Sequence, residues 1–307
     1  MGTATMDRFE IHVDGQTVTI THPEKLMWPQ KGIRKVDYLQ YLGTVAPYML
    51  PFLVDRALTV IRYPDGVGKK SFYQKNVPAH APEYVQTAMH DGNEHVVCSN
   101  QATLLWLGNQ GAVELHVPFN PVQQERPSEI VFDFDPPSRE EFLLSVEAVL
   151  IVKELLDKLG VISFVKTSGN KGLQIYIPLP DGRYGYEQTR VFTEFFAHYL
   201  VAKEPKWFTI ERFKAKRGNR LYVDYVQHAR GKTIIAPYSL RGNEEALVAA
   251  PLYWHEVNRS LSPTHFPLEQ IYKRLEKGAC PFANYQESKQ KQKLEPVLAW
   301  IESANRT

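Results

Sequence analysis

EIVFDFDPP, residues 129–137, is the stretch that decides the fold. Its apolar residues predict a β-strand that ends at the two prolines. Side chains alternate between the faces of a strand, so Asp133 and Asp135 share one face while Phe132 and Phe134 lie on the other. Two neighbouring carboxylates repel each other unless a cation neutralises them, and a hard ion such as Mg²⁺ or Mn²⁺ suits oxygen ligands. A solvent-facing strand end is the alternative for this stretch taken alone.

The composition is that of a globular protein. The chain has 307 residues, of which 43% are hydrophobic and 23% charged, and this suffices for a large core in one or two domains. Its formal charge is +2, so a polyanion site must come from locally clustered Lys and Arg. Cys98 and Cys280 lie far apart, which argues against a disulfide framework and a cysteine-ligated zinc site. With no signal peptide and no apolar run of roughly 18 residues, we expect a cytosolic protein without membrane contacts.

The first hundred residues contain two candidate contacts to nucleic acid. Residues 9–20 alternate around Asp14-Gly15, which predicts a hairpin. A turn rich in cations then leads into an amphipathic helix, and this turn can hold a phosphate or be a solvated basic loop. The cations are Lys25, Lys31, Arg34 and Lys35. Farther on, Phe72 and Tyr73 follow a basic loop and can either stack on unpaired bases or belong to the core.

Two helices are predicted on either side of the acidic stretch. Residues 103–115 predict a buried helix with small residues for close packing, and His116 comes just after it. A lone histidine in that place is more often structural than functional. Ser138 and Glu141 have the spacing of a capping box, which predicts a second helix that is closed by Gly160.

A strand, a turn and a strand are predicted over residues 161–178. The turn is Thr167-Ser168-Gly169-Asn170-Lys171-Gly172. Its two glycines let the backbone approach a polyanion, and Ser168 and Lys171 add a hydroxyl and a cation, which together can form a phosphate cradle. A plain hairpin turn with a solvated lysine is the alternative. A further helix is predicted over residues 186–201.

A third acid follows in a basic region. The strand predicted over residues 221–227 contains Asp224, and Lys and Arg flank it in the sequence. A buried acid needs a partner, and a salt bridge to Arg230 or Arg241 is the structural alternative. Joined to the two aspartates of residues 129–137, Asp224 makes the third carboxylate of the kind that two-metal nucleotidyl transfer requires.

Four ordered motifs resemble the polymerase domain of bacterial ligase D, in the archaeo-eukaryotic primase superfamily. They are Phe132-Asp133-Phe134-Asp135-Pro136, Thr167-Ser168-Gly169-Asn170-Lys171-Gly172-Leu173, Val223-Asp224-Tyr225-Val226-Gln227 and Ala236-Pro237-Tyr238-Ser239-Leu240-Arg241. The resemblance runs from about Thr21 to Trp254. It implies an α+β fold, with a primase-like catalytic core of central mixed and antiparallel β-sheets flanked by helices.

The same resemblance implies an activity and its partners. The chain would be a template-directed nucleotidyltransferase, a DNA polymerase of the primase-polymerase type that uses NTP or dNTP. It would fill gaps and extend DNA ends in double-strand break repair by non-homologous end joining, and it would associate with the nucleoid. Its partners would be DNA ends and gapped DNA, the Ku protein and a DNA ligase that is either fused or separate.

Individual residues receive roles from this resemblance. The catalytic residues and ligands of a two-metal site for Mg²⁺ or Mn²⁺ would be Asp133, Asp135 and Asp224. The nucleotide contacts would be His116, Ser168, Lys171, Arg217, Gln227, Arg230, Ser239 and Arg241. A downstream 5′-phosphate would bind Lys25 and Lys35, and the aromatic pair that stacks at the template would be Phe72 and Tyr73.

Three residues depart from the family pattern. Gln174 stands where the family usually has histidine, so an uncharged amide must take over the role of the imidazole. His22 and His228 stand where asparagine is more common. These departures affect the second motif, the 5′-phosphate pocket and the third motif.

We expect one compact unit in three stretches. Residues 1–125 would carry the 5′-phosphate and template contacts, residues 126–260 the catalytic primase-polymerase core, and residues 261–307 a C-terminal helical tail. Two other functions stay open at this point. One is a primase that starts chains on single-stranded DNA, and the other is a non-catalytic nucleic-acid-binding module with structural carboxylates.

Overall fold

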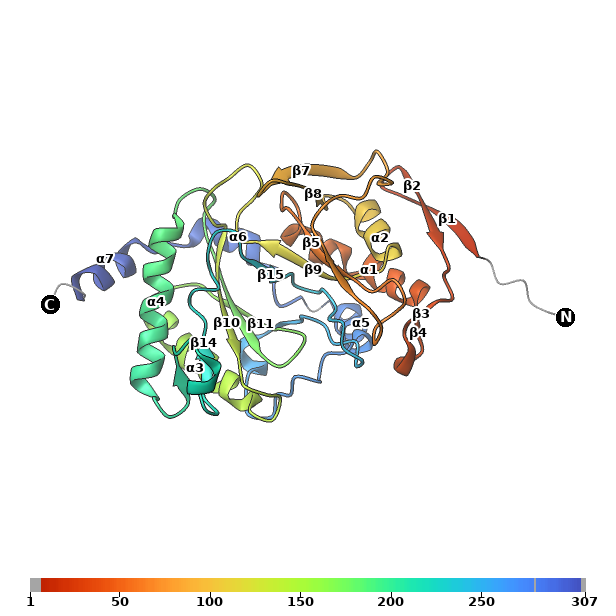
Figure 1. Ribbon diagram of the computed structural model, residues 1–307. Coiled ribbons are helices and arrows are strands. Elements are labelled where there is room, and N and C mark those ends of the chain that lie inside the picture. Colours follow the sequence, from red (N-terminus) through yellow and green to blue (C-terminus); the bar gives the residue numbers. More distant parts are fainter. Residues whose placement is uncertain (1–6, 279, 305–307) are drawn as a thin grey trace. The chain divides into compact units, whose positions relative to one another are not determined.

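The computed structural model describes residues 7–278 and 280–304 (Figure 1). Contacts divide these residues into two compact units, each built from three stretches of sequence. Unit 1 comprises residues 7–118, 233–249 and 266–278, and unit 2 comprises residues 119–232, 250–265 and 280–304. The three functional stretches expected from the sequence, with boundaries at residues 125 and 260, stay a prediction.

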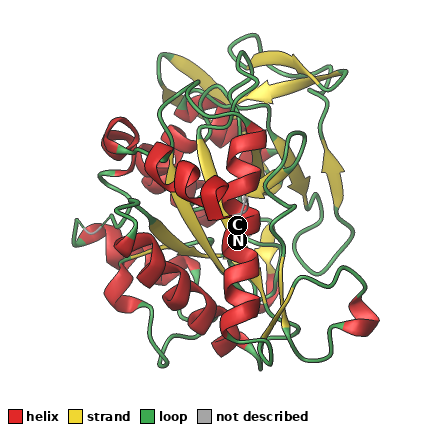
Figure 2. Ribbon diagram, turned by 90° about the vertical axis from the view of Figure 1, so that its left-hand side faces the viewer, coloured by secondary structure: helices red, strands yellow, loops and turns green. Residues whose placement is uncertain are grey.

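Helices and strands occur in both units. Figure 2 colours the helices red and the strands yellow. Short 3₁₀ turns connect some of them, at Pro29–Lys31, Leu50–Phe52, Lys214–Lys216 and Trp254–Glu256. Within the described part of the chain, no helix is long and apolar enough to cross a membrane.

Unit 2 is organised around a six-stranded sheet in the order β13-β14-β10-β12-β11-β16. Its strands are β10 (Glu129–Asp135), β11 (Phe164–Thr167), β12 (Leu173–Pro178), β13 (Phe208–Thr209), β14 (Leu221–Val223) and β16 (Pro251–Leu252). Neighbouring strands are antiparallel except for the parallel pair of β13 and β14. The strand predicted from the acidic stretch is confirmed, and it lies inside the sheet.

Two of the four helices described in unit 2, α3 and α4, cover one face of this sheet. The helices of unit 2 are α3 (Phe142–Lys158), α4 (Tyr186–Lys203), α6 (Tyr285–Lys291) and α7 (Glu295–Ala304). The ring of Phe132 on β10 lies 5.5 Å from that of Phe196 on α4, and Ser145 on α3 donates a hydrogen bond of 2.9 Å to the carbonyl of Phe134. Burying a phenylalanine contributes about 1.5–3 kcal/mol, so this face anchors β10.

Aromatic side chains cover one end of the opposite face. Tyr176 on β12 pairs in register with Val131 on β10, and its ring lies 5.9 Å from that of Phe282 and 6.3 Å from that of Tyr285 on α6. Asp133 and Asp135 lie on the same face nearer the end of β10, because they follow Val131 at intervals of two residues. The alternation predicted for β10 therefore separates an aromatic half of this face from an acidic half.

Unit 1 contains a four-stranded sheet in the order β15-β9-β5-β6 and three two-stranded sheets. Its strands are β1 (Arg8–Val13), β2 (Gln16–Thr21), β3 (Leu26–Trp28), β4 (Ile33–Arg34), β5 (Thr59–Arg62), β6 (Phe72–Gln74), β7 (Gln86–His90), β8 (Asn93–Val97), β9 (Ala112–Pro118) and β15 (Thr233–Ile235). The hairpin predicted around Asp14-Gly15 is confirmed as β1 and β2. In Figure 1, β9 runs beside β5 and β15.

The helices of unit 1 are α1 (Lys35–Met49), α2 (Gln101–Asn109) and α5 (Leu268–Glu276). Helices α1 and α2 pack closely because Gly108 has no side chain. A Cβ atom at Gly108 would lie only 2.4 Å from Cδ1 of Leu42 on α1. The close packing predicted from the small residues of this helix is confirmed.

Three predicted boundaries are wrong. The helix predicted over residues 103–115 ends at Asn109, and Gly111, with a φ of 77°, turns the chain into β9, so that His116 lies in a strand. The capping box also fails, because Glu141 is the residue before α3 and no side chain caps this helix. The strand predicted over residues 221–227 ends at Val223, which leaves Asp224 just beyond β14.

Candidate active site

A pocket of about 550 Å³ lies in unit 2 beside the end of β10. Its lining residues are Asp133, Asp135, Pro136, Pro137, Lys171, Lys214, Arg217, Gly218, Arg220, Tyr222, Asp224 and Gln227. The antiparallel register of β10 and β14 pairs Phe134 with Val223. Asp133 and Asp224 are the residues next to this pair, one on each chain segment. All three predicted aspartates therefore line one pocket, with four Lys and Arg residues around them.

Gln174 connects Asp133 to the interior of the sheet. It pairs in register with Asp133 on one side and with Lys166 on the other, and its Nε2 donates a hydrogen bond of 3.0 Å to Oδ1 of Asp133. Gln174 is buried, and within the described structure its Oε1 has no hydrogen-bond partner. The amide at this position thus holds one oxygen of Asp133.

The turn between β11 and β12 brings a cation to the rim of the pocket. Lys171 Nζ donates hydrogen bonds to the carbonyls of Pro136 (2.7 Å) and Pro137 (3.3 Å), and it lies 3.7 Å from Oδ2 of Asp135. Since its partners belong to the segment that directly follows β10, Lys171 is held beside the acidic strand.

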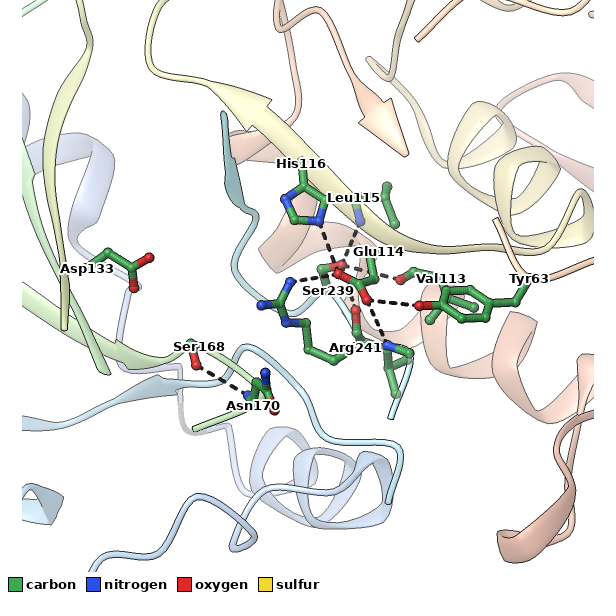
Figure 3. Close-up of polar contacts among 12 residues, drawn as sticks. Tyr63, Val113, Glu114, Leu115, His116, Asp133, Ser168, Asn170, Ser239 and Arg241 are labelled. Carbon is green, nitrogen blue, oxygen red and sulfur yellow. Dashed lines mark hydrogen bonds and ion pairs between the residues drawn. The ribbon is translucent and has the colours of Figure 1, made fainter. Parts of the chain in front are cut away.

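Ser168 and Gly172 shape the same turn. The Ser168 hydroxyl accepts hydrogen bonds from the backbone N–H groups of Gly172 (3.0 Å) and Asn170 (3.3 Å, Figure 3). A Cβ atom at Gly172 would lie 2.4 Å from the carbonyl oxygen of Phe134 and 2.8 Å from Oδ1 of Asp135. The turn therefore approaches β10 so closely that this position requires glycine. The buried Ser168 hydroxyl supports the turn in this structure, and its contact with a nucleotide stays a prediction.

Arg217 is fixed by the loop that it belongs to. Its Nε and Nη2 donate hydrogen bonds of 2.8 Å to the carbonyls of Glu211 and Arg212, and its guanidinium lies 3.7 Å from the ring centre of Tyr222. Cation–π stacking of this kind contributes about 0.5–1 kcal/mol at an exposed site. The arginine is thus held on the wall of the pocket.

The salt bridge considered for Asp224 is not formed by either arginine. Arg230 pairs with Glu125 at 2.9 Å, and Arg241 pairs with Glu114 at 2.7 Å. Asp224 instead accepts a hydrogen bond of 3.4 Å from the Tyr222 hydroxyl. The exposed Arg230 is outside the set of residues that line the pocket, so its contact with a nucleotide stays a prediction.

The donor chemistry of the pocket fits a hard divalent cation. Carboxylate oxygens are the ligands that Mg²⁺ and Mn²⁺ prefer, and this pocket supplies three aspartates. In residues 7–278 and 280–304, no three His, Cys, Asp or Glu side chains are grouped closely enough to hold an ion. One or two of the aspartates, together with water and substrate phosphates, would suffice to hold Mg²⁺.

Unit 1 contains a second cluster of charged side chains, around Glu114 on β9 (Figure 3). Its Oε2 accepts hydrogen bonds from Arg241 Nη1 (2.7 Å) and His116 Nε2 (3.1 Å). Its Oε1 accepts from the backbone N–H of Gly242 (3.0 Å) and the hydroxyl of Tyr63 (3.2 Å). Burial raises the pKa of Glu114, but His116, Arg241 and Gly242 outweigh this and lower the pKa to about 2. Glu114 is therefore a carboxylate at any physiological pH.

The backbone beside Arg241 is held in an unusual conformation. Tyr238 has a φ of 67°, a left-handed value that costs a residue with a side chain about 1–3 kcal/mol. Its carbonyl accepts a hydrogen bond of 2.7 Å from the Tyr41 hydroxyl on α1. The neighbouring Ser239 is buried, and its hydroxyl accepts from the Leu115 N–H at 2.9 Å. Ser239 thus joins this segment to β9, and its contact with a nucleotide stays a prediction.

The residues predicted for a 5′-phosphate also lie in unit 1. Lys25 Nζ donates to the carbonyl of Pro64, while Lys35 Nζ donates to the carbonyl of Thr21 at 2.7 Å and to Asn109 at 3.4 Å. The backbone N–H of Lys35 donates to the carbonyl of Lys25, so the two lysines are adjacent. Burial, with smaller effects of Lys25 and Arg62, lowers the pKa of Lys35 to about 8.

The predicted aromatic pair is exposed, in contrast to the core alternative. Phe72 on β6 is 42% exposed and Tyr73 is 74% exposed. The guanidinium of Arg62 lies 5.4 Å from the ring centre of Phe72. Both rings are therefore accessible to a base, and stacking on the template stays a prediction.

Three residues of these two clusters were not predicted from the sequence, namely Glu114, Lys214 and Arg220. Lys214 and Arg220 belong to the basic region before Asp224, and both line the pocket. For Glu114, the signal was its spacing of two residues from His116, which places both side chains on one face of a strand. The incorrect assignment of a helix to this segment concealed that signal.

Comparisons with known proteins agree with this geometry. The model of the LigD primase-polymerase domain matches residues 34–282. The bifunctional non-homologous end joining protein LigD of Bacillus subtilis is 49% identical over 278 residues, which cover 91% of this chain and 46% of that protein. The multifunctional non-homologous end joining DNA repair protein LigD of Mycobacterium tuberculosis is 33% identical over 79% of this chain and 34% of that protein.

A solved structure of a ligase D polymerase domain is also similar to this chain. The polymerase domain from Mycobacterium tuberculosis ligase D, in complex with DNA, matches with a TM-score of 0.78 at 29% identity. The match covers 86% of this chain and 96% of that one.

The fold and the site define an α+β enzyme of the primase-polymerase type, which is a nucleotidyltransferase. The chain belongs to the LigD primase-polymerase domain family. The predicted resemblance and fold class are thereby confirmed. The chain spans less than half the length of the two curated relatives described above, so the activities of those whole proteins are not transferred to it.

Proposed function

We propose that this chain is a template-directed nucleotidyltransferase that fills gaps and extends DNA ends during double-strand break repair by non-homologous end joining. Membership of the family supports this function. Within the molecule, one observation carries the proposal: Asp133 and Asp135 on β10 and Asp224 just beyond β14 line one pocket with four basic residues. A pure binding module has little use for three acids at a site for a polyanion.

The chemistry of the pocket is electrostatic. When bound among the aspartates, Mg²⁺ or Mn²⁺ would supply the positive charge that activates a primer 3′-hydroxyl and stabilises the departing pyrophosphate. Lys171 and Arg217, both held by backbone carbonyls, would neutralise phosphate oxygens of an incoming NTP or dNTP. Gln174 would keep Asp133 oriented through its 3.0 Å hydrogen bond.

Unit 1 would recognise the DNA end. Lys25 and Lys35 would bind a downstream 5′-phosphate, and the exposed rings of Phe72 and Tyr73 would stack on template bases. The solved domain from Mycobacterium tuberculosis was studied in complex with DNA, which supports DNA as the substrate here. We further propose Ku and a DNA ligase as partners, and a cytoplasmic, nucleoid-associated location.

Substitution of the aspartates tests the proposal. We expect Asp133→Asn or Asp224→Asn to reduce primer extension on gapped DNA at least about 100-fold, because either change removes charge from the metal site. Asp157→Asn, which changes an exposed acid on α3, serves as the matched control and is expected to extend DNA like the wild type. Extension near the wild-type rate by both site variants would refute the assignment.

The same assay separates the other two functions. A primase would add nucleotides on unprimed single strands as readily as on gapped DNA. A binding module would retain DNA without metal-dependent incorporation on either substrate. Comparison of Mg²⁺ with Mn²⁺, and of NTP with dNTP, would identify the preferred cofactor and substrate.

A further inference from the structure

Glu114 has no capacity left for a metal ion or a substrate. A carboxylate offers about four acceptor positions, and each oxygen of Glu114 already accepts two hydrogen bonds. The side chain is only 9% exposed, whereas that of its partner Arg241 is 24% exposed. Any ligand at this cluster would therefore meet the donors that surround Glu114 rather than Glu114 itself.

The other parts of the cluster fix the carboxylate in place. A Cβ atom at Gly242 would lie 1.8 Å from the hydroxyl oxygen of Tyr63, so this glycine lets Tyr63 reach Glu114. Burial and the adjacent carboxylate raise the pKa of Tyr63 to about 12, and the phenol stays a donor. Tyr63 and Gly242 hold Oε1, while Arg241 and His116 share Oε2.

We propose that Glu114 is a positioning residue for nucleotide binding, whose carboxylate orients Arg241 and His116 and itself touches no substrate. This inference rests on the proposed function, together with the nucleotide contacts that the resemblance to the family implies for Arg241 and His116. Two flexible side chains held on one carboxylate oxygen lose little further freedom when a phosphate binds, which favours binding. Hydrogen bonds to charged groups are the strong ones, so this arrangement is rigid.

The variant Glu114→Gln tests this role because it keeps the shape of the side chain and removes its charge. An amide can accept on one side only, so it cannot satisfy the donor pair of Arg241 and His116 together with that of Tyr63 and Gly242. We expect the Kd for ATP, measured by calorimetry with Mg²⁺ and gapped DNA present, to rise at least about tenfold. The affinity for 5′-phosphorylated gapped DNA, which also depends on unit 1, is expected to change less than about twofold.

Tyr63→Phe is the matched control, since it removes one neutral donor from the same carboxylate. We expect its Kd for ATP to stay within about threefold of the wild-type value, because the pair of Arg241 and His116 is left intact. If Glu114→Gln does not fold, Glu114→Asp can be used instead. It keeps the charge, but its shorter side chain moves the carboxylate away from Arg241 and His116. The same loss, specific to ATP, is then expected.

Three results would overturn the inference: wild-type ATP affinity in Glu114→Gln, equal losses of ATP and DNA affinity, or equal losses in Glu114→Gln and Tyr63→Phe. A wild-type protein that binds no ATP would overturn it as well. Failure of the proposed function looks different. A wild-type protein that binds ATP but extends no primer would refute the polymerase, while the ratio of ATP affinities would still decide the role of Glu114.

Discussion

Lys35 shows at the scale of one residue how burial prepares a charge for a ligand. It lies at the first position of α1 and is only 5% exposed, with its ammonium hydrogen-bonded to Thr21 and Asn109. Its described contacts offer no carboxylate, and burial together with Lys25 and Arg62 lowers its pKa to about 8. A phosphate bound beside it would supply the missing negative charge.

The preference for a 5′-phosphate is therefore expected to depend on pH. Lys35 is mostly charged at pH 7 and mostly neutral at pH 9, because its pKa of about 8 lies between these values. A terminal phosphate is mostly a dianion at both pH values. We expect the ratio of affinities for phosphorylated and unphosphorylated gapped DNA to fall by up to about tenfold from pH 7 to pH 9. Fluorescence anisotropy with both DNAs measures this ratio.

Lys35→Arg is the control for this titration. Arginine keeps its charge throughout the range, so the ratio is expected to stay nearly constant between pH 7 and pH 9. A wild-type ratio that does not change with pH would contradict the role of Lys35. So would an equal fall in the arginine variant.

At the scale of elements, the contact between β10 and the turn before β12 sets the shape of the pocket. Gly172 lies against the backbone of Phe134 and the carboxylate of Asp135, and Lys171 reaches the carbonyls of the prolines that end β10. A strand and a turn that are distant in sequence thus position each other.

Gly172→Ala is expected to disturb both stability and activity. The added methyl group would lie far inside contact distance of Phe134 and Asp135, so the turn must move away from β10. Overpacking of this kind costs about 1–3 kcal/mol, measured as the free energy of unfolding in urea, and primer extension is expected to fall with the displacement of Asp135.

Gly185→Ala provides the comparison for this variant. It also lies in unit 2, but nothing lies within 4 Å of its added Cβ atom. We expect its free energy of unfolding to change by less than about 0.5 kcal/mol. Equal effects of the two substitutions would show that the approach of the turn to β10 does not matter.

Elements with a local signal were predictable from the sequence, and their long-range partners were not. Alternation placed the acids of β10 on one face, and the glycines marked the turn at residues 167–172, because these properties depend on neighbours in the chain. The boundary between α2 and β9 was missed, since an apolar run can form either element until its packing is known. The partner of Arg241 could not be derived, because it pairs with a strand more than a hundred residues earlier.

At the scale of the whole molecule, each unit is built from three separate stretches of the chain. Unit 1 needs residues 233–249, since β15 pairs with β9 and Arg241 binds Glu114. Buried residues such as Leu240 and Val248 in the same stretch add to its core. Neither unit corresponds to one continuous segment, which sequence patterns alone do not reveal.

A fragment of residues 1–118 is consequently expected not to fold cooperatively. It lacks β15 and the stretch that carries Arg241, which would leave one edge of β9 without a partner and the charge of Glu114 uncompensated. Thermal unfolding followed by circular dichroism tests this expectation. A chain that joins the three stretches of unit 1 through flexible linkers is expected to regain a transition. A sharp transition in the short fragment would show that the later stretches are dispensable.

The balance of charge in the pocket of unit 2 has a consequence for how the protein meets DNA. Four basic side chains and three aspartates give its lining a formal charge of +1, which leaves +1 for the rest of the chain. At physiological salt, screening confines the attraction between these charges and phosphates to about 8 Å. We therefore expect the protein to bind intact duplex DNA weakly. The undamaged chromosome would then not sequester the protein, which would stay available for broken ends.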